Sequence, residues 1–352
     1  MDNIELPPAL IRDGLEFHNV SELEPVTGGF LLQRFPASVR RHEGTNELGR
    51  LVMTKAAGAE IRFVTPAKRV RVSFSALEEP SLVYVFRGDF FHREHMIPAG
   101  GTACFLLERP AALDYFKDER YENCRFSPGM WRVWCGRECT VFGGLDTFGA
   151  WVRPPESGEK PGLRWLAYGS SYTMGGNAIF QPGCYAEQAA RILGVDVLNL
   201  GLGGSCHLEP HVMDHIASRN DWDFATLRVG GNMVGEIDPE EYRRRLEYAL
   251  STLHARRPGK PVFIIGLSTS QIRLHREIKI WQEHAIAYHD IDSELAARHP
   301  EVVLLRTGDL LPDHRLYCTD MDHPDDLGHL QIATNLAAAI RRSGRLPGLI
   351  GI

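Results

Sequence analysis

Hydrophobic and polar positions alternate with the period of β-strands through the first part of the chain. Val70, Val72 and Phe74 alternate with polar residues, which predicts a strand with one buried face. Residues 60–64 alternate in the same way. Further strand-like runs lie at 81–86, 103–107, 131–134 and 140–142. No convincing helical period interrupts them, so an antiparallel β-sandwich, of the jelly-roll kind, is predicted here.

After residue 163 the pattern changes to apolar runs separated by helical periods. The runs lie at 164–168, 195–200, 224–229, 262–266 and 302–305. Between them, residues 239–257 carry apolar side chains at helical spacing, and Asp238 before Pro239 suits an N-cap. Alternating strands and helices predict a parallel sheet covered on both faces.

A segment rich in proline, glycine and charge separates the two patterns. It runs from Arg153 to Gly162 and is typical of a linker. A chain of 352 residues is also long for one domain. We therefore divide it into a sandwich domain at 1–155, a linker at 156–162 and an α/β domain at 163–352.

Charge and composition exclude several classes of partner. Lys and Arg number 39 against 45 for Asp and Glu, a net charge of −6 without a basic block, so neither nucleic acid nor an anionic membrane is expected as a partner. No stretch reaches the apolar length of a membrane span, and the N-terminus lacks the features of a signal peptide. A cytoplasmic location is therefore expected. The oligomeric state is left open, with a homo-oligomer as one option.

Cysteines and histidines give no metal motif. The seven cysteines are scattered, which favours reduced thiols. Cys135 and Cys139 are spaced too widely for a zinc knuckle and have no second pair, and the glutamate between His92 and His95 is misplaced for a zinc protease. We expect no metal and no organic cofactor.

Three residues, one early and two late in the α/β part of the chain, have the residue types needed for acyl transfer. Ser171 follows the strand predicted at 164–168, at the edge where open α/β sheets bind ligands. Asp320 and His323 lie three residues apart, just before the last predicted helix. A serine nucleophile, a histidine base and an orienting aspartate form a catalytic unit in serine hydrolases.

Two further strand ends offer hydrogen-bond donors. The second predicted strand runs into a glycine-rich loop that contains Gly204, and the third runs into Gly230-Gly231-Asn232. Backbone N–H groups of Ser171 and Gly204, with the amide of Asn232, could bind the oxyanion of a tetrahedral intermediate. Taken alone, such residues are more often turn, capping or packing residues.

The order of these blocks resembles the SGNH hydrolases, also called GDSL esterases and lipases. Their Gly-Asp-Ser motif corresponds to residues 169–171, their oxyanion glycine and asparagine to Gly204 and Asn232, and their Asp-x-x-His motif to residues 320–323. The resemblance covers about residues 163–342. It implies a flavodoxin-like three-layer α/β/α hydrolase domain behind the sandwich, with Asp320 rather than Asp322 as the orienting acid.

The sequence departs from this family pattern at two positions. Ser170 stands where the family has Asp, and Met233 replaces the second Asp of the asparagine block. Neither position carries a reacting group, so the departures concern the hydrogen bonds that support the loops.

A sandwich in front of such a domain resembles the two-domain carbohydrate esterases of the acetylxylan type. This implies removal of an acetyl group from a carbohydrate alcohol, with a small-molecule or oligosaccharide ester as substrate. A generic short-chain carboxylesterase or lipase-like acylhydrolase is the alternative. His207 and Glu209, just past the glycine loop, are candidate substrate-binding residues. Tryptophans 131, 134 and 151 could stack on sugars, although strand spacing favours the core.

Two readings without enzyme activity stay open. The loop at 169–173 could cradle a flavin phosphate in a flavodoxin-like protein. This interpretation gives no role to Asp320 and His323. A carbohydrate-binding protein with an inactive hydrolase domain is the other.

Overall fold

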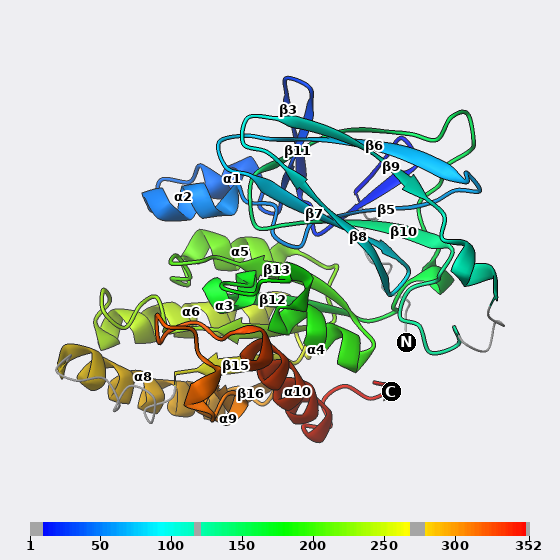
Figure 1. The fold of residues 1–352 in the computed structure, drawn as a ribbon. Coiled ribbons are helices and arrows are strands. Elements are labelled where there is room, and N and C mark those ends of the chain that lie inside the picture. Colours follow the sequence, from blue (N-terminus) through cyan, green and yellow to red (C-terminus); the bar gives the residue numbers. More distant parts are fainter. Residues whose placement is uncertain (1–9, 116–120, 268–278, 350–352) are drawn as a thin grey trace.

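The computed structural model describes residues 10–115, 121–267 and 279–349, whose strands form three sheets (Figure 1). Two are antiparallel, with strand orders β1-β2-β5-β10-β7-β8 and β3-β4-β11-β6-β9. Their strands are β1 Leu10–Arg12, β2 Leu15–His18, β3 Glu22–Val26, β4 Gly29–Gln33, β5 Glu60–Val64, β6 Arg69–Ala76, β7 Ser81–Arg87, β8 Phe90–Ile97, β9 Thr102–Glu108, β10 Met130–Cys135 and β11 Thr140–Asp146. Apolar side chains of both sheets share one core, so the predicted antiparallel sandwich is confirmed.

The third sheet is parallel, with the order β13-β12-β14-β15-β16. Its strands are β12 Arg164–Gly169, β13 Asp196–Gly201, β14 Phe224–Arg228, β15 Val262–Gly266 and β16 Val302–Arg306. Each lies within one residue of the predicted run at either end. The parallel sheet predicted from alternating strands and helices is confirmed.

Helices cover both faces of the parallel sheet. They are α3 Ser171–Met174, α4 Tyr185–Leu193, α5 Pro210–Ser218, α6 Pro239–Arg256, α8 Lys279–Arg298, α9 Thr307–Leu310 and α10 Asp326–Arg342. Side chains of α5, α6 and α8 pack with Leu166 and Tyr168 of β12, while those of α4 and α10 pack with Trp165 and Ala167. Because strand side chains alternate between faces, these two clusters are the two sides of a three-layer unit. None of the helices in the described ranges is long and apolar enough to cross a membrane.

Two short helices in the first part of the chain were not predicted. They are α1 Ala37–Arg40 and α2 Glu47–Met53, the latter N-capped by Asn46, whose Oδ1 accepts the Gly49 N–H at 2.6 Å. Neither is long enough to show a helical period. Val52 and Met53 of α2 pack in the cluster that contains Leu166 and the α5 side chains. The hydrophobic core of the α/β unit therefore extends into residues that precede the linker.

Strand β5 corrects one expectation. Alternation predicted one buried face, but all five residues are buried. Arg62 donates to both carboxylate oxygens of Asp196, at 2.6 and 2.9 Å, and its Nε donates to Glu60 at 2.7 Å. Arg132 of β10 also donates to Glu60, with its Nε 2.8 Å from Oε2. The polar face of the strand is thus covered by the α/β unit, and pairing makes the burial of its charges tolerable.

The segment predicted as a linker is held by ion pairs. It contains the 3₁₀ turn Ser157–Glu159, and Arg153 donates to the two Glu159 oxygens at 2.7 and 2.9 Å. Lys160 bonds the buried Glu16 of β2. These contacts fix the segment against the first sheet.

The pKa values of two buried carboxylates at this contact are shifted in opposite directions. Burial alone would raise the pKa of Asp196, but attraction to Arg62 holds it well below its usual range. Glu187 of α4 accepts a 3.4 Å hydrogen bond from Trp134 Nε1. Burial, reinforced by repulsion from Glu60, raises the pKa of Glu187 to about 7.

We expect Glu187→Gln to change how stability depends on pH. The unfolded chain ionises this carboxyl near its ordinary pKa, roughly 4.3. The folded protein keeps the proton until its pKa of about 7, so folding binds a proton between these values and stability falls as pH rises through them. Melting temperatures from about pH 5 to about pH 8 should therefore fall more steeply for the wild type than for the variant. The exposed Glu78→Gln is the control, and parallel curves for wild type and Glu187→Gln would contradict the assignment.

Candidate active site

Ser171 begins the short helix α3, directly after β12 and Ser170. Its Oγ lies 2.7 Å from Nε2 of His323. On the other side of the ring, Nδ1 lies 2.9 Å from Oδ2 of Asp320. The structure therefore brings together the serine, histidine and aspartate predicted from the sequence, in an unbroken chain of hydrogen bonds.

Asp320 is fixed by several donors. Its Oδ1 accepts the backbone N–H groups of Asp322 and His323, each at 3.0 Å, and Oδ2 accepts the Asn177 amide at 2.8 Å. The bond from the His323 N–H is the largest of the effects that hold the pKa of Asp320 well below its usual range. An ionised carboxylate only accepts hydrogen bonds, so the proton of neutral His323 belongs on Nδ1, which leaves Nε2 to accept the Ser171 hydroxyl proton.

Asp322 is less suited to orient the histidine. Its Oδ2 lies 3.8 Å from His323 Nδ1, and its side chain is 75% exposed. Its backbone carbonyl instead accepts the hydroxyl of Tyr172. This contact ties the loop of His323 to the helix of Ser171.

Gly176 lies between the serine and the histidine. A Cβ at this position would stand 3.0 Å from Cδ2 of His323 and 3.2 Å from Cβ of Ser171. Any larger residue would push the two catalytic candidates apart, so this close approach requires glycine.

The glycine loop after β13 lies against Ser171. A Cβ on Gly203 would stand 3.6 Å from Cβ of Ser171, and Gly204 adopts the left-handed φ of +70°. Asn232, which follows β14, accepts the Cys206 N–H through Oδ1 at 3.2 Å. This bond leaves the Nδ2 end of the amide for donation. Ser171, Gly204 and Asn232 follow the carboxyl ends of β12, β13 and β14. That they donate hydrogen bonds to an oxyanion stays a prediction.

His207 and Glu209 lie behind this loop. His207 is 7% exposed, and its ring nitrogens lie 3.1 Å from Nδ2 of Asn46 and from the carbonyl oxygen of Asn232. Glu209 is 5% exposed, and burial raises its pKa. In this arrangement His207 supports Asn232, and neither side chain lines an open surface. Their contact with substrate stays a prediction.

The two family departures have different surroundings. Ser170 Oγ accepts Nη1 of the buried Arg228 at 2.7 Å, and the Arg228 guanidinium lies 3.5 Å from the centre of the Tyr172 ring. Arg228 thus contacts a neutral hydroxyl and an aromatic face. In the family that the chain resembles, the position of Ser170 carries a carboxylate. Met233 is fully buried and packs in the core of the α/β unit.

The first part of the chain contributes residues that no sequence motif indicated. Leu48 of α2 covers the glycine loop, since a Cβ on Gly204 would stand 2.9 Å from its Cδ2. Arg137, from the β10–β11 turn, donates to the Gly175 carbonyl at 2.7 Å and, through its backbone N–H, to Gln181 at 2.9 Å. The loop that leaves the nucleophile helix is therefore held by the sandwich.

Two hollows lie along that loop. One, of about 310 Å³, lies between the sandwich and the α/β unit, and the other, of about 460 Å³, lies beside Asn177. The first is lined by Phe86, Asp89, Arg125, Arg132, Trp134, Phe180, Pro182, Gly183, Glu187, Gln188, Arg191 and Asp326, and the second by Asn177, Ile179, Cys318, Asp325, Asp326 and Leu327. They share Asp326. Of the three candidate tryptophans, Trp134 lines the first hollow, whereas Trp131 is buried in the core and Trp151 is 57% exposed.

Comparisons with known proteins found a family model and solved structures that match this chain. The model of the GDSL-like lipase/acylhydrolase family matches residues 164–341. No curated protein matches the chain. A salicylyl-acyltransferase from a tetracycline biosynthetic pathway has a similar structure, with a TM-score of 0.77, 18% identity and coverage of 95% of this chain and 96% of that one.

Two solved carbohydrate esterases share the fold. One is a family two carbohydrate esterase from Clostridium thermocellum in complex with cellohexaose, with a TM-score of 0.57, 13% identity and coverage of 82% and 94%. The other is an acetyl xylan esterase from Butyrivibrio proteoclasticus, with a TM-score of 0.54, 11% identity and coverage of 96% and 97%. At these identities the likeness concerns the fold alone.

We expect Ser171→Ala and His323→Ala each to reduce kcat for p-nitrophenyl acetate by about 10⁴-fold or more, because members of such a unit fail together. Ser170→Ala is the matched control. Its hydroxyl bonds Arg228 rather than His323, so its loss should be far smaller. A folded Ser171→Ala protein with near-normal turnover would exclude Ser171 as nucleophile.

Asn232→Ala should lower kcat by about a hundredfold while KM changes little, because the amide donates most strongly when the carbonyl becomes an oxyanion. Steady-state kinetics on the same ester separate the two constants. A loss confined to KM would identify Asn232 as a ground-state binding residue.

Proposed function

Because the chain belongs to the GDSL-like lipase/acylhydrolase family, we propose that it is a serine esterase that removes an acetyl group from a carbohydrate alcohol through an acyl-enzyme. The observation that carries the proposal is the contact from Asp320 through His323 to Ser171, with separations of 2.9 and 2.7 Å. This is the arrangement that activates a serine hydroxyl toward an ester carbonyl.

The chemistry follows from the contacts. His323 Nε2 takes the Ser171 proton as Oγ attacks the carbonyl carbon, and the ionised Asp320 stabilises the resulting imidazolium. Backbone N–H groups of Ser171 and Gly204 and the Asn232 amide bind the oxyanion. The imidazolium then protonates the departing alcohol. Water, deprotonated by the same nitrogen, releases acetate from Ser171.

The hollow between the two units supports a carbohydrate alcohol as leaving group. Its wall combines donors and acceptors with aromatic surface: Arg125, Glu187 and Gln188 lie beside Trp134 and Phe180. Hydroxyl groups of a sugar need both kinds of polar partner, and its C–H faces pack on aromatic rings. Binding pockets of roughly 300–1,000 Å³ are usual for small ligands, and this one is at the lower end.

Leu48 supports a small acyl group. Its side chain stands over Gly204, the residue whose N–H is proposed to bind the oxyanion. A long acyl chain that leaves the carbonyl on this side would meet Leu48, whereas an acetyl methyl group is short enough to avoid it.

A second candidate, a generic short-chain carboxylesterase, is favoured by the other hollow. Ile179 and Leu327, which line it beside Asn177, are 84% and 63% exposed. Exposed apolar side chains beside Asn177, which bonds Asp320, fit an apolar alcohol or acyl group better than a sugar.

A substrate panel separates these candidates. Acetylated xylo- and cello-oligosaccharides should give higher kcat/KM than p-nitrophenyl acetate if the sugar is recognised. Equal or lower values would favour the generic esterase. Repeating the assay with an added alcohol acceptor separates hydrolysis from acyl transfer, the activity that the salicylyl-acyltransferase's name states.

Leu48→Ala should widen acyl-chain acceptance. We expect the ratio of kcat/KM for p-nitrophenyl hexanoate to that for the acetate to rise by about tenfold, which is within the specificity range of a few methylene groups. Leu77→Ala, an exposed leucine in the turn after β6, is the matched control. An unchanged ratio would show that Leu48 does not contact the acyl chain.

A further inference from the structure

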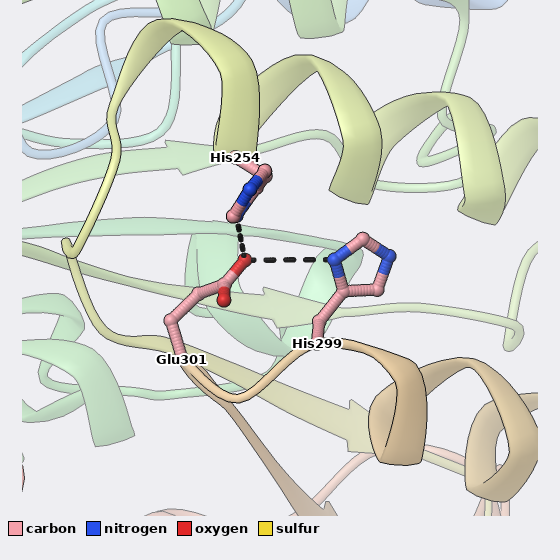
Figure 2. Close-up of side chains that lie close together, drawn as sticks. All are labelled: His254, His299 and Glu301. Atoms are coloured by element: carbon pink, nitrogen blue, oxygen red, sulfur yellow. Dashed lines mark hydrogen bonds and ion pairs between the residues drawn. The ribbon is translucent and has the colours of Figure 1, made fainter.

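A second cluster of chemically capable side chains lies away from Ser171. His254 comes from the last turns of α6, His299 directly follows α8, and Glu301 directly precedes β16. Figure 2 shows the three side chains turned toward one another. His254 Nδ1 lies 2.9 Å and His299 Nδ1 3.5 Å from the same oxygen, Oε1 of Glu301.

These separations suit ligands of one metal ion. Zinc binds imidazole nitrogen at about 2.0–2.1 Å and carboxylate oxygen at about 2.0–2.2 Å, so tetrahedral ligands stand roughly 3.3–3.5 Å apart. The three ligand atoms all lie within 4.8 Å of one another. Two histidines and a carboxylate form a donor set that zinc and neighbouring divalent metals accept.

The backbone holds two of the three ligands in place. The N–H of Val302 donates to the His299 carbonyl at 3.0 Å, and the N–H of Val262 donates to the Glu301 carbonyl at 3.1 Å. The side chains of His299 and Glu301 are only 16% and 11% exposed, whereas that of His254 is 54% exposed. The cluster thus has a fixed base and one ligand at the surface, which leaves a path for an ion and for water as a further ligand.

The arginines that neighbour the cluster in the sequence contact groups outside it. Arg256 pairs with Asp214, Arg257 donates to the carbonyls of Ala217 and Ser218, and Arg298 pairs with Glu294.

We propose that His254, His299 and Glu301 form a binding site for a divalent transition metal of the zinc type, and that the ion has a structural role. The cluster lies at the amino ends of β15 and β16, whereas Ser171, Gly204 and Asn232 follow the carboxyl ends of β12, β13 and β14. A bound ion would join α6, α8 and β16 and would stand at the edge of the sheet opposite the proposed catalytic residues.

The test uses the full-length protein without a histidine tag, stripped with a chelator and dialysed. Titration calorimetry with Zn²⁺ should show one ion bound per chain, and zinc should raise the melting temperature by linkage. His254→Ala, His299→Ala and Glu301→Gln should each weaken zinc binding by at least about tenfold, since even loss of a residue that only orients a ligand has such an effect. Co²⁺ added in place of zinc should give the visible absorption of a site with imidazole ligands, lost in the histidine variants.

Two controls locate the ion. His314→Ala removes another exposed histidine, and His323→Ala removes the one at the proposed catalytic site. Both should bind zinc as the wild type does. Esterase activity of the wild type should change by less than about twofold between the stripped and the zinc-loaded protein. Wild-type protein that binds no zinc, or His254, His299 and Glu301 variants that bind it as well as the wild type, would overturn the proposal and leave the cluster as an ion pair.

Discussion

The buried contact between Arg62 and Asp196 is the constraint on which the arrangement of the two units depends. Both side chains are almost fully buried, and each would be very unfavourable in this place without the other. Removing one partner of such a pair costs about 3–5 kcal/mol, because the remaining charge is left in a medium that cannot solvate it. Glu60 and Arg132 extend the pair, so four charges of the sandwich and the sheet balance one another. This contact also helps to position the candidate site, because Asp196 begins the strand that ends at the glycine loop.

Backbone groups reinforce the same contact. Arg34 donates through Nη1 to the carbonyls of Asn199 and Gly201, each at 3.0 Å, and His18 Nε2 lies 2.7 Å from the Val197 carbonyl. Strand β13 is an edge strand of the parallel sheet, and its outer carbonyls need partners when they are buried. The sandwich supplies them.

Strongly periodic elements were readable from the sequence, and contacts between distant segments were not. The five parallel strands are short apolar runs buried on both faces, so a local pattern locates them well. The prediction of one buried face for β5 was wrong, because apolar and charged residues alternate in the same way whether the charged face contacts water or paired counter-charges. Helix α2 is seven residues long, and its burial depends on a core formed by residues more than a hundred positions later.

The residues of the candidate site that stand in sequence motifs were predictable, and those that only the fold brings to the site were not. Ser171, Asp320 and His323 stand in short blocks whose order is distinctive, and the structure places them in contact. Asn177, Arg137 and Leu48 have no such signal, because an amide, an arginine and a leucine are ordinary surface residues until the fold brings them to a loop. The substrate contact of His207 and Glu209 stays a prediction, because their polarity and their place near the glycine loop do not show which side of the loop each side chain occupies.

The aromatic contact of Phe180 has a consequence for how this chain could have diversified. Phe180 lies on the loop that leaves the Ser171 helix, and its ring stands 5.4 Å from Tyr84 and 5.3 Å from Phe91, both on the sandwich. A sandwich taken from another protein would have to reproduce these rings, the Arg137 turn and the charges that face Asp196. Recombination at the boundary between the units would therefore rarely give a working hybrid. Sequence change on either side of the boundary should instead be correlated, and the two units should be inherited as a pair.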